Sequence, residues 1–341
     1  MKKALVLGVT GQDGSYAAES LLEKGYEIHG LIRRSATGNR KNIEHFAERV
    51  NLHAGDLADA TSLYRAIGSI KPDELYNFAD QDHVRWSTET PDYSSEITGA
   101  AVGRILEIIK QISPRTRMLQ PISSNVFGLA AENPQREETL LNPQSPYACA
   151  KAYALHLARF HRNVNGLFVS TAIFYNHESP RRIDDYVTRK ITRGVAGILK
   201  GKQEKIILGD IDLGIDFGFA GDYVEASQEI LKLDRPDDFI ICTGELHTVR
   251  EFLEEAFRCV GIDISWQGEG LNESGYDRKT GVKRVEFSPK FYRPGRTSPL
   301  CGDNSKARRI FGFNPKVKFK DLVSLMVNHD LKEISARYAD G

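Results

Sequence analysis

The sequence predicts an α/β fold with a doubly wound parallel sheet and a smaller C-terminal lobe. Three observations support this prediction. Short β-branched and aliphatic runs alternate with amphipathic stretches through the first half of the chain, and strands that alternate with helices build parallel sheets. A glycine-rich turn follows the first of these runs directly. The regular alternation then ends near residue 176.

The elements of the first half follow from hydrophobic periodicity. The predicted strands are Ala4–Leu7, Glu27–Ile32, Val50–His53, Glu74–Asn77, Arg117–Ile122 and Leu167–Tyr175. The predicted helices are Tyr16–Lys24, Ser62–Ile70, Glu96–Ile112 and Tyr147–Val164.

The second half is less regular. We assign residues 1–175 to a dinucleotide-binding domain, to which later segments near 209–243 return, and residues 176–341 mainly to a discontinuous substrate lobe. Lys205–Leu208 and Phe239–Thr243 resemble short strands. Ser265–Pro289 is polar and glycine-rich, which predicts a long surface excursion. Ser305–Phe311 and Phe319–His329 are predicted as C-terminal helices.

The glycine-rich turn is the first functional signal. Gly8, Gly11 and Gly14 fit a G-x-x-G-x-x-G spacing between a strand and a helix, which is typical of a Rossmann dinucleotide site. Glycines allow the tight turn and the close approach of a pyrophosphate, which binds at the helix N-terminus. We assign the intervening Thr10, Gln12 and Asp13 to the same cofactor site.

The end of the second strand indicates which dinucleotide binds. An acidic residue there accepts from the ribose 2′-hydroxyl of NAD, whereas basic residues accommodate the 2′-phosphate of NADP. Arg33 and Arg34 occupy this place, so NADP is favoured over NAD, although an exposed basic turn gives the same pattern. Asp56 and Leu57, after the third strand, are placed to meet the adenine edge.

A Tyr-x-x-x-Lys pair provides the catalytic prediction. Tyr147 and Lys151 lie four residues apart, on one face of a helix. A nearby ammonium lowers the pKa of a phenol from about 10 toward neutrality, which makes a general base for a sugar hydroxyl. Ser123 or Ser124, at the end of the preceding strand, supplies a hydrogen bond to that hydroxyl. The alternative is an amphipathic helix with a lysine reaching toward solvent.

Composition excludes other classes of function. The 46 Lys and Arg residues equal the 46 Asp and Glu residues, so no net charge draws the chain to nucleic acid or a membrane. No apolar run approaches the roughly 20 residues of a membrane span, and a cytoplasmic location is expected. Four widely spaced cysteines suit reduced core thiols, and the nine histidines lack metal-ligand spacing, so no bound metal is expected.

Several segments together resemble the GDP-mannose 4,6-dehydratase family, a branch of the extended short-chain dehydrogenases/reductases. The resemblance covers nearly the whole chain, and its most specific part is the pair formed by Asn176–Arg182 and Val187–Ile191. The other matching segments are Gly8–Gly14, Arg33–Ser35, Pro72–Asn77, Ser145–Ala148 with Lys151, Thr243–Glu245 with Val249–Phe252, and Arg293–Pro294.

The resemblance implies a reaction and its residues. A bound NADP would oxidise C4 of a nucleotide-linked hexose, water would leave across C5 and C6, and the hydride would return to C6. Tyr147, Lys151 and Ser123 match the base, its helper and the hydroxyl donor. The remaining assignments are Phe78, His177 and Arg182 to the cofactor, and Asp82, Asn176, Lys190 and Arg293 to the sugar nucleotide. The basic loop from Arg33 to Arg40 implies a homotetramer built from dimers.

The sequence departs from the family at several positions. The dehydratases carry a Glu that removes the C5 proton where this chain has Asn125, and an amide cannot act as that base. Asp80-Gln81-Asp82 replaces an Ala-Gln-Ser near the cofactor, and Gly214-Ile215 replaces a basic pair near the nucleotide. Arg296 and Ser298 replace acidic residues.

These departures leave three hypotheses. A GDP-sugar 4,6-dehydratase is the first, with Asp80 or Asp82 as a substitute for the missing carboxylate. A 4-epimerase or C4 dehydrogenase, which needs no carboxylate at Asn125, is the second. A non-catalytic NADP-binding protein is the third.

Overall fold

Seven parallel strands form the central sheet of the computed structural model, which describes residues 1–35, 40–291 and 299–339. Their spatial order is β11-β6-β5-β4-β1-β2-β3, and every pairing is parallel. The strands are β1 (Lys3–Leu7), β2 (Glu27–Ile32), β3 (Asn51–Ala54), β4 (Glu74–Asn77), β5 (Arg117–Ser123), β6 (Val169–Phe174) and β11 (Asp238–Ile241). The order reverses between β1 and β4, where open α/β sheets bind ligands. The predicted fold class is confirmed.

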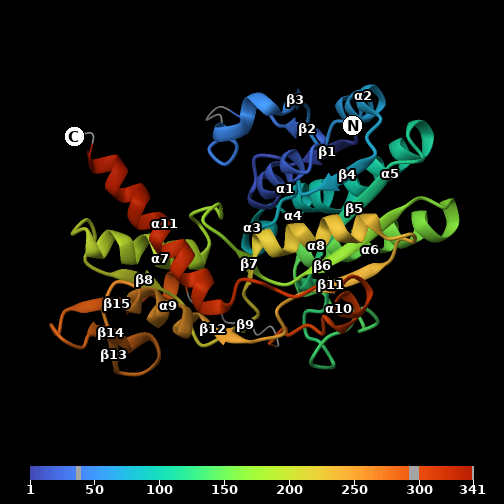
Figure 1. The fold of residues 1–341 in the computed structure, drawn as a ribbon. Helices are drawn as coiled ribbons and strands as arrows, with labels where there is room; N and C mark the ends of the chain where they lie inside the picture. Colours follow the sequence, from blue (N-terminus) through green and yellow to red (C-terminus); the bar gives the residue numbers. More distant parts are fainter. Residues whose placement is uncertain (36–39, 292–298, 340–341) are drawn as a thin grey trace. The chain divides into compact units, whose positions relative to one another are not determined.

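Helices cover both faces of this sheet because its strands are apolar on both sides (Figure 1). In β1, Leu5 and Leu7 pack into one core, whereas Ala4 and Val6 pack into the other. The first core includes residues of α2 (Ala60–Ile70), α5 (Ala101–Ile112) and α6 (Pro146–Asn165), and the second includes residues of α1 (Gln12–Glu23), α8 (Ala220–Lys232) and α10 (Ser305–Phe311).

One predicted helix is divided. The residues before α5 form a π-helical turn, Ser95–Ala100, preceded by α3 (Val84–Glu89) and α4 (Pro91–Ser94). Such turns are rare and occur often at functional sites. This one faces α6, the helix that carries Tyr147 and Lys151.

The chain divides into two compact units. The first unit comprises Met1–Tyr175, Ala220–Gly244 and Leu300–Asn314, and the second comprises Asn176–Phe219, Glu245–Pro299 and Pro315–Gly341. The second unit has its own core, built from α7 (Val187–Leu199), α9 (Val249–Arg258), α11 (Phe319–Ala339) and a small sheet. Each unit therefore has a hydrophobic core of its own.

The predicted surface excursion at Ser265–Pro289 is wrong, because most of it belongs to the small sheet of the second unit. The sheet has the order β13-β14-β15-β8, with β13 (Ile264–Gln267), β14 (Ser274–Asp277), β15 (Lys283–Phe287) and β8 (Ile206–Leu208). Val285 is fully buried, and a Cβ on Gly275 would lie 3.0 Å from the side chains of Ile264 and Val285. This glycine therefore serves close packing between strands instead of marking a loop.

Two pairs of short strands complete the second unit. β7 (His177–Glu178) pairs in parallel with β10 (Gly218–Phe219). β9 (Gly214–Ile215) pairs antiparallel with β12 (His247–Thr248). The Gly214-Ile215 dipeptide that replaces the family's basic pair thus forms a strand.

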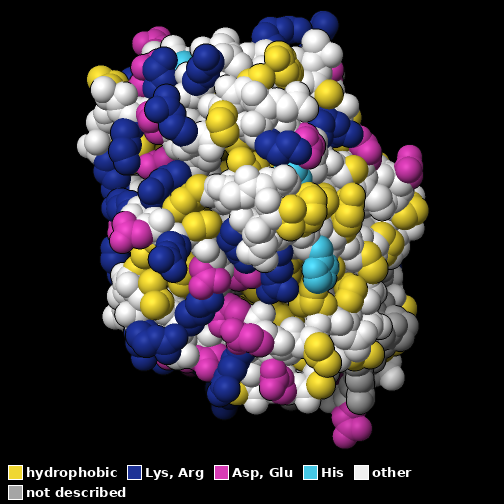
Figure 2. All heavy atoms as spheres, turned by 90° about the vertical axis from the view of Figure 1, so that its right-hand side faces the viewer, with side chains coloured by type: hydrophobic (Ala, Val, Ile, Leu, Met, Phe, Trp, Pro, Cys, Tyr) yellow, Lys and Arg dark blue, Asp and Glu magenta, His cyan; other side chains and the backbone are white. Residues whose placement is uncertain are grey.

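Charges of both signs are mixed on the described surface. Figure 2 shows a face on which Lys and Arg side chains gather along one margin, with Asp and Glu side chains among them. None of the helices within the described residues is both long and apolar enough to cross a membrane. The four cysteines are free, but Cys149 and Cys259 are exposed, so the expectation of core thiols is wrong for these two.

Candidate active site

The glycine turn is tightly constrained by its neighbours. Gly8 has a φ of +75°, and a Cβ there would lie 2.8 Å from backbone atoms of Phe78 and Ala79, just beyond β4. A Cβ on Gly14 would lie 2.2 Å from the Gly8 carbonyl oxygen. Only glycine fits these two positions, because one requires a left-handed backbone and the other has no room for a side chain.

The helix after the turn begins at Gln12, four residues earlier than predicted. Its N-cap is Gly11, which makes no side-chain capping hydrogen bond. Backbone N–H groups at an uncapped helix N-terminus are donors for an anion. The turn therefore fits the pyrophosphate of a dinucleotide. In the glycine turn, Gln12 Nε2 donates to Asp13 Oδ1 at 3.1 Å, and the Thr10 carbonyl oxygen accepts from the Asn42 side chain.

Arg33 and Arg34 follow β2 directly, and both are exposed. Arg33 Nη1 donates to the Tyr93 hydroxyl at 2.7 Å, which holds one guanidinium over the end of the sheet. Residues 33–35 contain no carboxylate. The predicted basic end of the second strand is therefore present as an exposed pair of arginines beside the Ser35 hydroxyl.

Three residues assigned to the cofactor lie after β3 and β4: Asp56 and Leu57, predicted to meet the adenine edge, and Phe78. The Asp56 carboxylate accepts from the Ala58 N–H at 2.9 Å, and the buried Leu57 uses its carbonyl to accept from Arg104. Phe78 stacks on Tyr76, with ring centroids 6.1 Å apart. These bonds fix the loops at the carboxyl edge of the sheet, where a dinucleotide binds.

The Tyr-x-x-x-Lys pair lies in the first turns of α6. The Ser145 hydroxyl caps this helix by accepting from the Ala148 N–H at 3.1 Å, and Pro146 occupies the first helical position. Tyr147 and Lys151 are both buried, with 6% and 5% of their surface exposed. Lys151 Nζ lies 5.8 Å from the centroid of the Tyr147 ring, which places a positive charge beside the phenol.

Two further contacts fix Lys151. Its Nζ donates to the Pro121 carbonyl oxygen at 3.0 Å, which ties α6 to β5 two residues before Ser123. The same Nζ lies 2.5 Å from Asp80 Oδ2. Asp80 Oδ1 accepts from the Thr98 hydroxyl at 2.5 Å and from the Gln81 N–H at 2.7 Å. Asp80 therefore lies beside the predicted Tyr147–Lys151 pair, whereas Asp82 is exposed.

Ser123 ends β5, and Asn125 lies in the following turn. The Ser123 Oγ accepts from Asn125 Nδ2 at 2.9 Å and from the Asn125 backbone N–H at 3.2 Å. A hydroxyl has two acceptor lone pairs and one donor. Because both lone pairs are occupied, the Ser123 hydroxyl is directed to donate. Asn125 occupies the position at which the resemblance expects a carboxylate, and its amide instead orients the Ser123 hydroxyl.

The other predicted site residues belong to the second unit. Asn176 is exposed and uses its carbonyl oxygen to accept from Gly218, at the start of the β7–β10 pair that contains His177. The guanidinium carbon Cζ of Arg182 lies 3.6 Å from the Tyr186 ring centroid, and its Nε lies 3.6 Å from Oε2 of the buried Glu178. Arg293, like Arg296 and Ser298, lies outside the described residues.

Lys190 lies in a cationic cluster with an aromatic ring. Its Nζ is 3.6 Å from the Phe291 ring centroid, and Lys290 Nζ is 5.9 Å from the same ring. Partial burial, followed by repulsion from Lys290, lowers the pKa of Lys190 below its ordinary value. Two ammonium groups brought together in this way form a favourable place for a phosphate or diphosphate.

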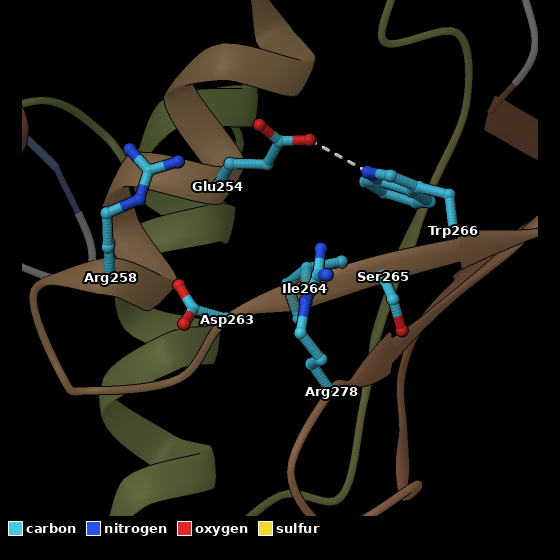
Figure 3. A pocket seen from close by; sticks show the side chains of 7 residues that line it. All are labelled: Glu254, Arg258, Asp263, Ile264, Ser265, Trp266 and Arg278. Carbon is cyan, nitrogen blue, oxygen red and sulfur yellow. Dashed lines mark hydrogen bonds between the residues drawn. The ribbon is translucent and has the colours of Figure 1, made fainter.

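Two other features of the second unit contain none of the predicted residues. A pocket of about 630 Å³ opens beside β13, where Glu254 of α9 accepts from the Trp266 indole (Figure 3). Within the described residues, His329, Asp330 and Glu333 bring possible metal-ligand atoms within 4.8 Å of one another. Asp330 already accepts twice from Arg189, however.

Comparisons with known proteins agree with this geometry. The family model described as GDP-mannose 4,6 dehydratase matches residues 5–326. The GDP-mannose 4,6-dehydratase of Sinorhizobium fredii (strain HH103) is 43% identical over 97% of this chain and 97% of its own. The human GDP-mannose 4,6 dehydratase is 42% identical over 96% of this chain and 91% of its own.

Solved structures share the fold. A UDP-glucose 4-epimerase from Thermotoga maritima, solved with UDP-glucose, has a TM-score of 0.83 and 21% identity over 97% of this chain and 99% of its own. RMD from Pseudomonas aeruginosa, complexed with NADPH, has a TM-score of 0.77 and 20% identity over 98% of this chain and 100% of its own. The UDP-glucose 4-epimerase of Thermus thermophilus, complexed with NAD, has a TM-score of 0.80 and 26% identity over 96% of this chain and 98% of its own. The family match and the long alignments confirm the predicted resemblance: the chain is an enzyme that belongs to the GDP-mannose 4,6-dehydratase family.

Proposed function

We propose that this enzyme oxidises C4 of a GDP-hexose to a 4-keto sugar and then removes water across C5 and C6. The cluster formed by the buried Tyr147 and Lys151 with the half-buried Asp80 is the observation that supports this proposal most directly. It is held against β5 through the Pro121 carbonyl. The family's shared activity supports the choice of a GDP-sugar and of dehydration.

Each residue of the first unit has a distinct task in the oxidation. Tyr147 accepts the proton of the C4 hydroxyl, and the charge of Lys151 favours its phenolate form. Ser123 donates to the C4 oxygen, because Asn125 occupies its lone pairs. When bound, NADP supplies the acceptor for the C4 hydride. Asn176 and Lys190 hold the sugar nucleotide, while His177 and Arg182 serve the nicotinamide end of the site.

NADP is the proposed cofactor because of Arg33 and Arg34. Each guanidinium can form charge-assisted hydrogen bonds to a 2′-phosphate. Replacing both with alanine should weaken NADP binding by about 10-fold or more while leaving NAD binding nearly unchanged, since a hydrogen bond to a charged group contributes roughly 1.5–3 kcal/mol. Titration of the purified protein with each dinucleotide tests this. Equal loss for both cofactors would contradict it.

A second function is favoured by one observation. Asn125 provides no carboxylate and is engaged with Ser123, an arrangement that suits a 4-epimerase or a C4 dehydrogenase, which forms the ketone without elimination. Asp80 is engaged with Lys151, so it is not placed as a replacement base at C5. In the dehydratase proposal, elimination is therefore the slow step.

Mass spectrometry of products from candidate nucleotide sugars separates the two functions. A product lighter by one water supports the dehydratase, whereas unchanged mass with inverted C4, or loss of two hydrogens, supports the alternative. Asn125→Glu should accelerate water loss by about 10² to 10⁴, the usual contribution of a general base. Tyr147→Phe is the control, because it should abolish turnover while cofactor still binds. Wild-type protein that binds NADP but never reduces it with any nucleotide sugar would indicate a non-catalytic role.

We also propose a cytoplasmic homo-oligomer, a dimer or tetramer, that binds neither nucleic acid nor membrane. Tyr153, Phe160 and Val164 lie on one face of α6 and are 53%, 49% and 67% exposed, which is unusual for apolar side chains. A second copy would cover them. Light scattering should show an oligomer that Phe160→Asp dissociates, and a wild-type monomer would contradict this.

A further inference from the structure

We propose that Asp80 is a positioning residue that sets the ionisation of Tyr147 through Lys151. The inference rests on the proposed role of Tyr147 as the base. The family's usual residue at this place is alanine, according to the resemblance described above, so the carboxylate is an addition in this chain. It lies on the loop that follows β4 and approaches the glycine turn.

The geometry makes Asp80 a built partner of Lys151 instead of a chance surface contact. The two side chains are 12% and 7% exposed, and their charged atoms lie 2.5 Å apart. Thr98 and the Gln81 N–H hold the other carboxylate oxygen. Gln81 is itself buried and accepts from the Ser94 hydroxyl at 2.9 Å. The Asp80 carboxylate is thus held directly by the Ser95–Ala100 turn and by its own loop, and α4 holds that loop through Ser94.

Other charges near α6 are engaged elsewhere. The elements packed against this helix include α3, α4, α5, the Ser95–Ala100 turn and β5. Their ionisable groups include the exposed Asp92 and several with named partners, and the exposed Arg115 lies in the connection between α5 and β5. Those groups and their partners are Glu96 with Arg104, Glu107 with Lys110, Arg85 with Glu89, Arg117 with the Leu231 carbonyl, and Tyr93 with Arg33. Asp82 and His83 follow Asp80 on its own loop.

The consequence is a reduced positive charge beside Tyr147. An isolated ammonium favours the phenolate strongly, whereas an ammonium paired with a carboxylate acts as a dipole whose influence falls off faster with distance. Tyr147 should therefore ionise at a higher pH than it would beside Lys151 alone. Oxidation at C4 should become fast only at correspondingly higher pH.

The test measures ionisation without any sugar. Near-ultraviolet absorbance of tyrosinate is followed against pH, and the curve of the matching Tyr147→Phe protein is subtracted. Asp80→Asn keeps the side-chain shape and removes the charge, and it should move the Tyr147 midpoint down by about one pH unit, at the low end of the shift one neighbouring charge produces. Asp80→Ala, with the family's residue, is a second variant in case the amide disturbs folding. Asp82→Asn is the matched control, because this exposed carboxylate should leave the midpoint unchanged.

The outcomes separate this inference from the proposed function. A lower midpoint in both Asp80 variants supports it, whether or not any nucleotide sugar is oxidised. An unmoved midpoint in folded variants overturns it. A higher midpoint also overturns it, because the carboxylate would then act by keeping Lys151 protonated. If cofactor reduction is observed, the acid limb of its pH profile should shift by the same amount as the midpoint.

Discussion

Two ion pairs shielded from solvent to different degrees, one in each unit, show how differently a protein can use opposite charges. In the second unit, both carboxylate oxygens of Asp330 accept from Arg189 Nη1, at 2.7 and 2.8 Å, and each side chain is 1% exposed. This pair joins α7 to α11. In the first unit, Asp80 contacts Lys151 through one oxygen and holds Thr98 through the other.

The cationic residue in each pair, arginine in one and lysine in the other, suits the role we assign to that pair. A guanidinium is always charged and presents a rigid fork, so the Arg189 pair is fixed and structural. An ammonium has three rotatable donors. Lys151 directs donors to Asp80 and Pro121, which leaves one for a bound ligand. We therefore expect the lysine pair, which lies beside a phenol, to serve chemistry as well as stability.

Breaking the structural pair should have the largest effect on the fold. Asp330→Ala leaves the buried Arg189 with only the exposed Asp184 carboxylate, 3.7 Å from its Nη2, and we expect a loss of about 3–5 kcal/mol of unfolding free energy. Chemical denaturation measures this loss. The double variant Arg189→Met with Asp330→Leu should regain most of it, because matched apolar side chains often replace a buried pair at little cost. A loss below about 1 kcal/mol for the single variant would mean that the pair is not structural.

Breaking the catalytic pair should instead act mainly on rate. Lys151→Met removes the charge beside Tyr147 and should lower turnover by about 10² to 10⁴. It also leaves the half-buried Asp80 carboxylate without its ammonium partner, so stability should fall. Adding Asp80→Asn should restore stability without restoring turnover. Recovery of both together would show that the pair serves the fold alone.

A second comparison sets Lys151, whose charge is compensated by Asp80, against Lys190, which faces another lysine and a phenyl ring. Lys190→Gln should raise KM for the nucleotide sugar by roughly 10- to 100-fold, since a hydrogen bond to a charged group contributes about 1.5–3 kcal/mol. The kcat should change little. Lys290→Gln is the control, with a smaller effect because Lys290 lies farther from the ring. A lower kcat at constant KM would contradict a binding role.

The sequence predicted those features that depend on local spacing. The glycine turn and the Tyr147–Lys151 pair both follow from short intervals within one strand–helix or helix segment. The central strands were predicted for the same reason, since buried parallel strands are apolar runs bounded by turns. The start of the first helix was predicted too late, at Tyr16 instead of Gln12. The N-cap residue, Gly11, has no capping side chain, so the sequence contains no signal for a helix start at that point.

Long-range contacts were beyond such patterns. Asp80 and Lys151 are far apart in sequence, and only the fold of β4, β5 and α6 brings them together, so Asp80 was considered as a base at C5 instead of a partner of the lysine. Arg189 and Asp330 are separated by 141 positions. The small sheet of the second unit was missed for a related reason, because Gly275 resembles a loop residue until its packing against Ile264 and Val285 is known.

The smallest expected effect concerns pH and the two lysines near Phe291. Burial and repulsion from Lys290 place the pKa of Lys190 below 10.5 in the folded chain, whereas the unfolded chain keeps the ordinary value. The unfolded state therefore binds more protons between these two values, so stability rises with pH across that window and is lost as pH falls through it. Lys290→Met removes the like charge, which should flatten this slope and stabilise the protein by less than about 1 kcal/mol. Urea unfolding at several pH values below 10.5 measures the slope, and an unchanged slope would show that the two ammonium groups do not interact.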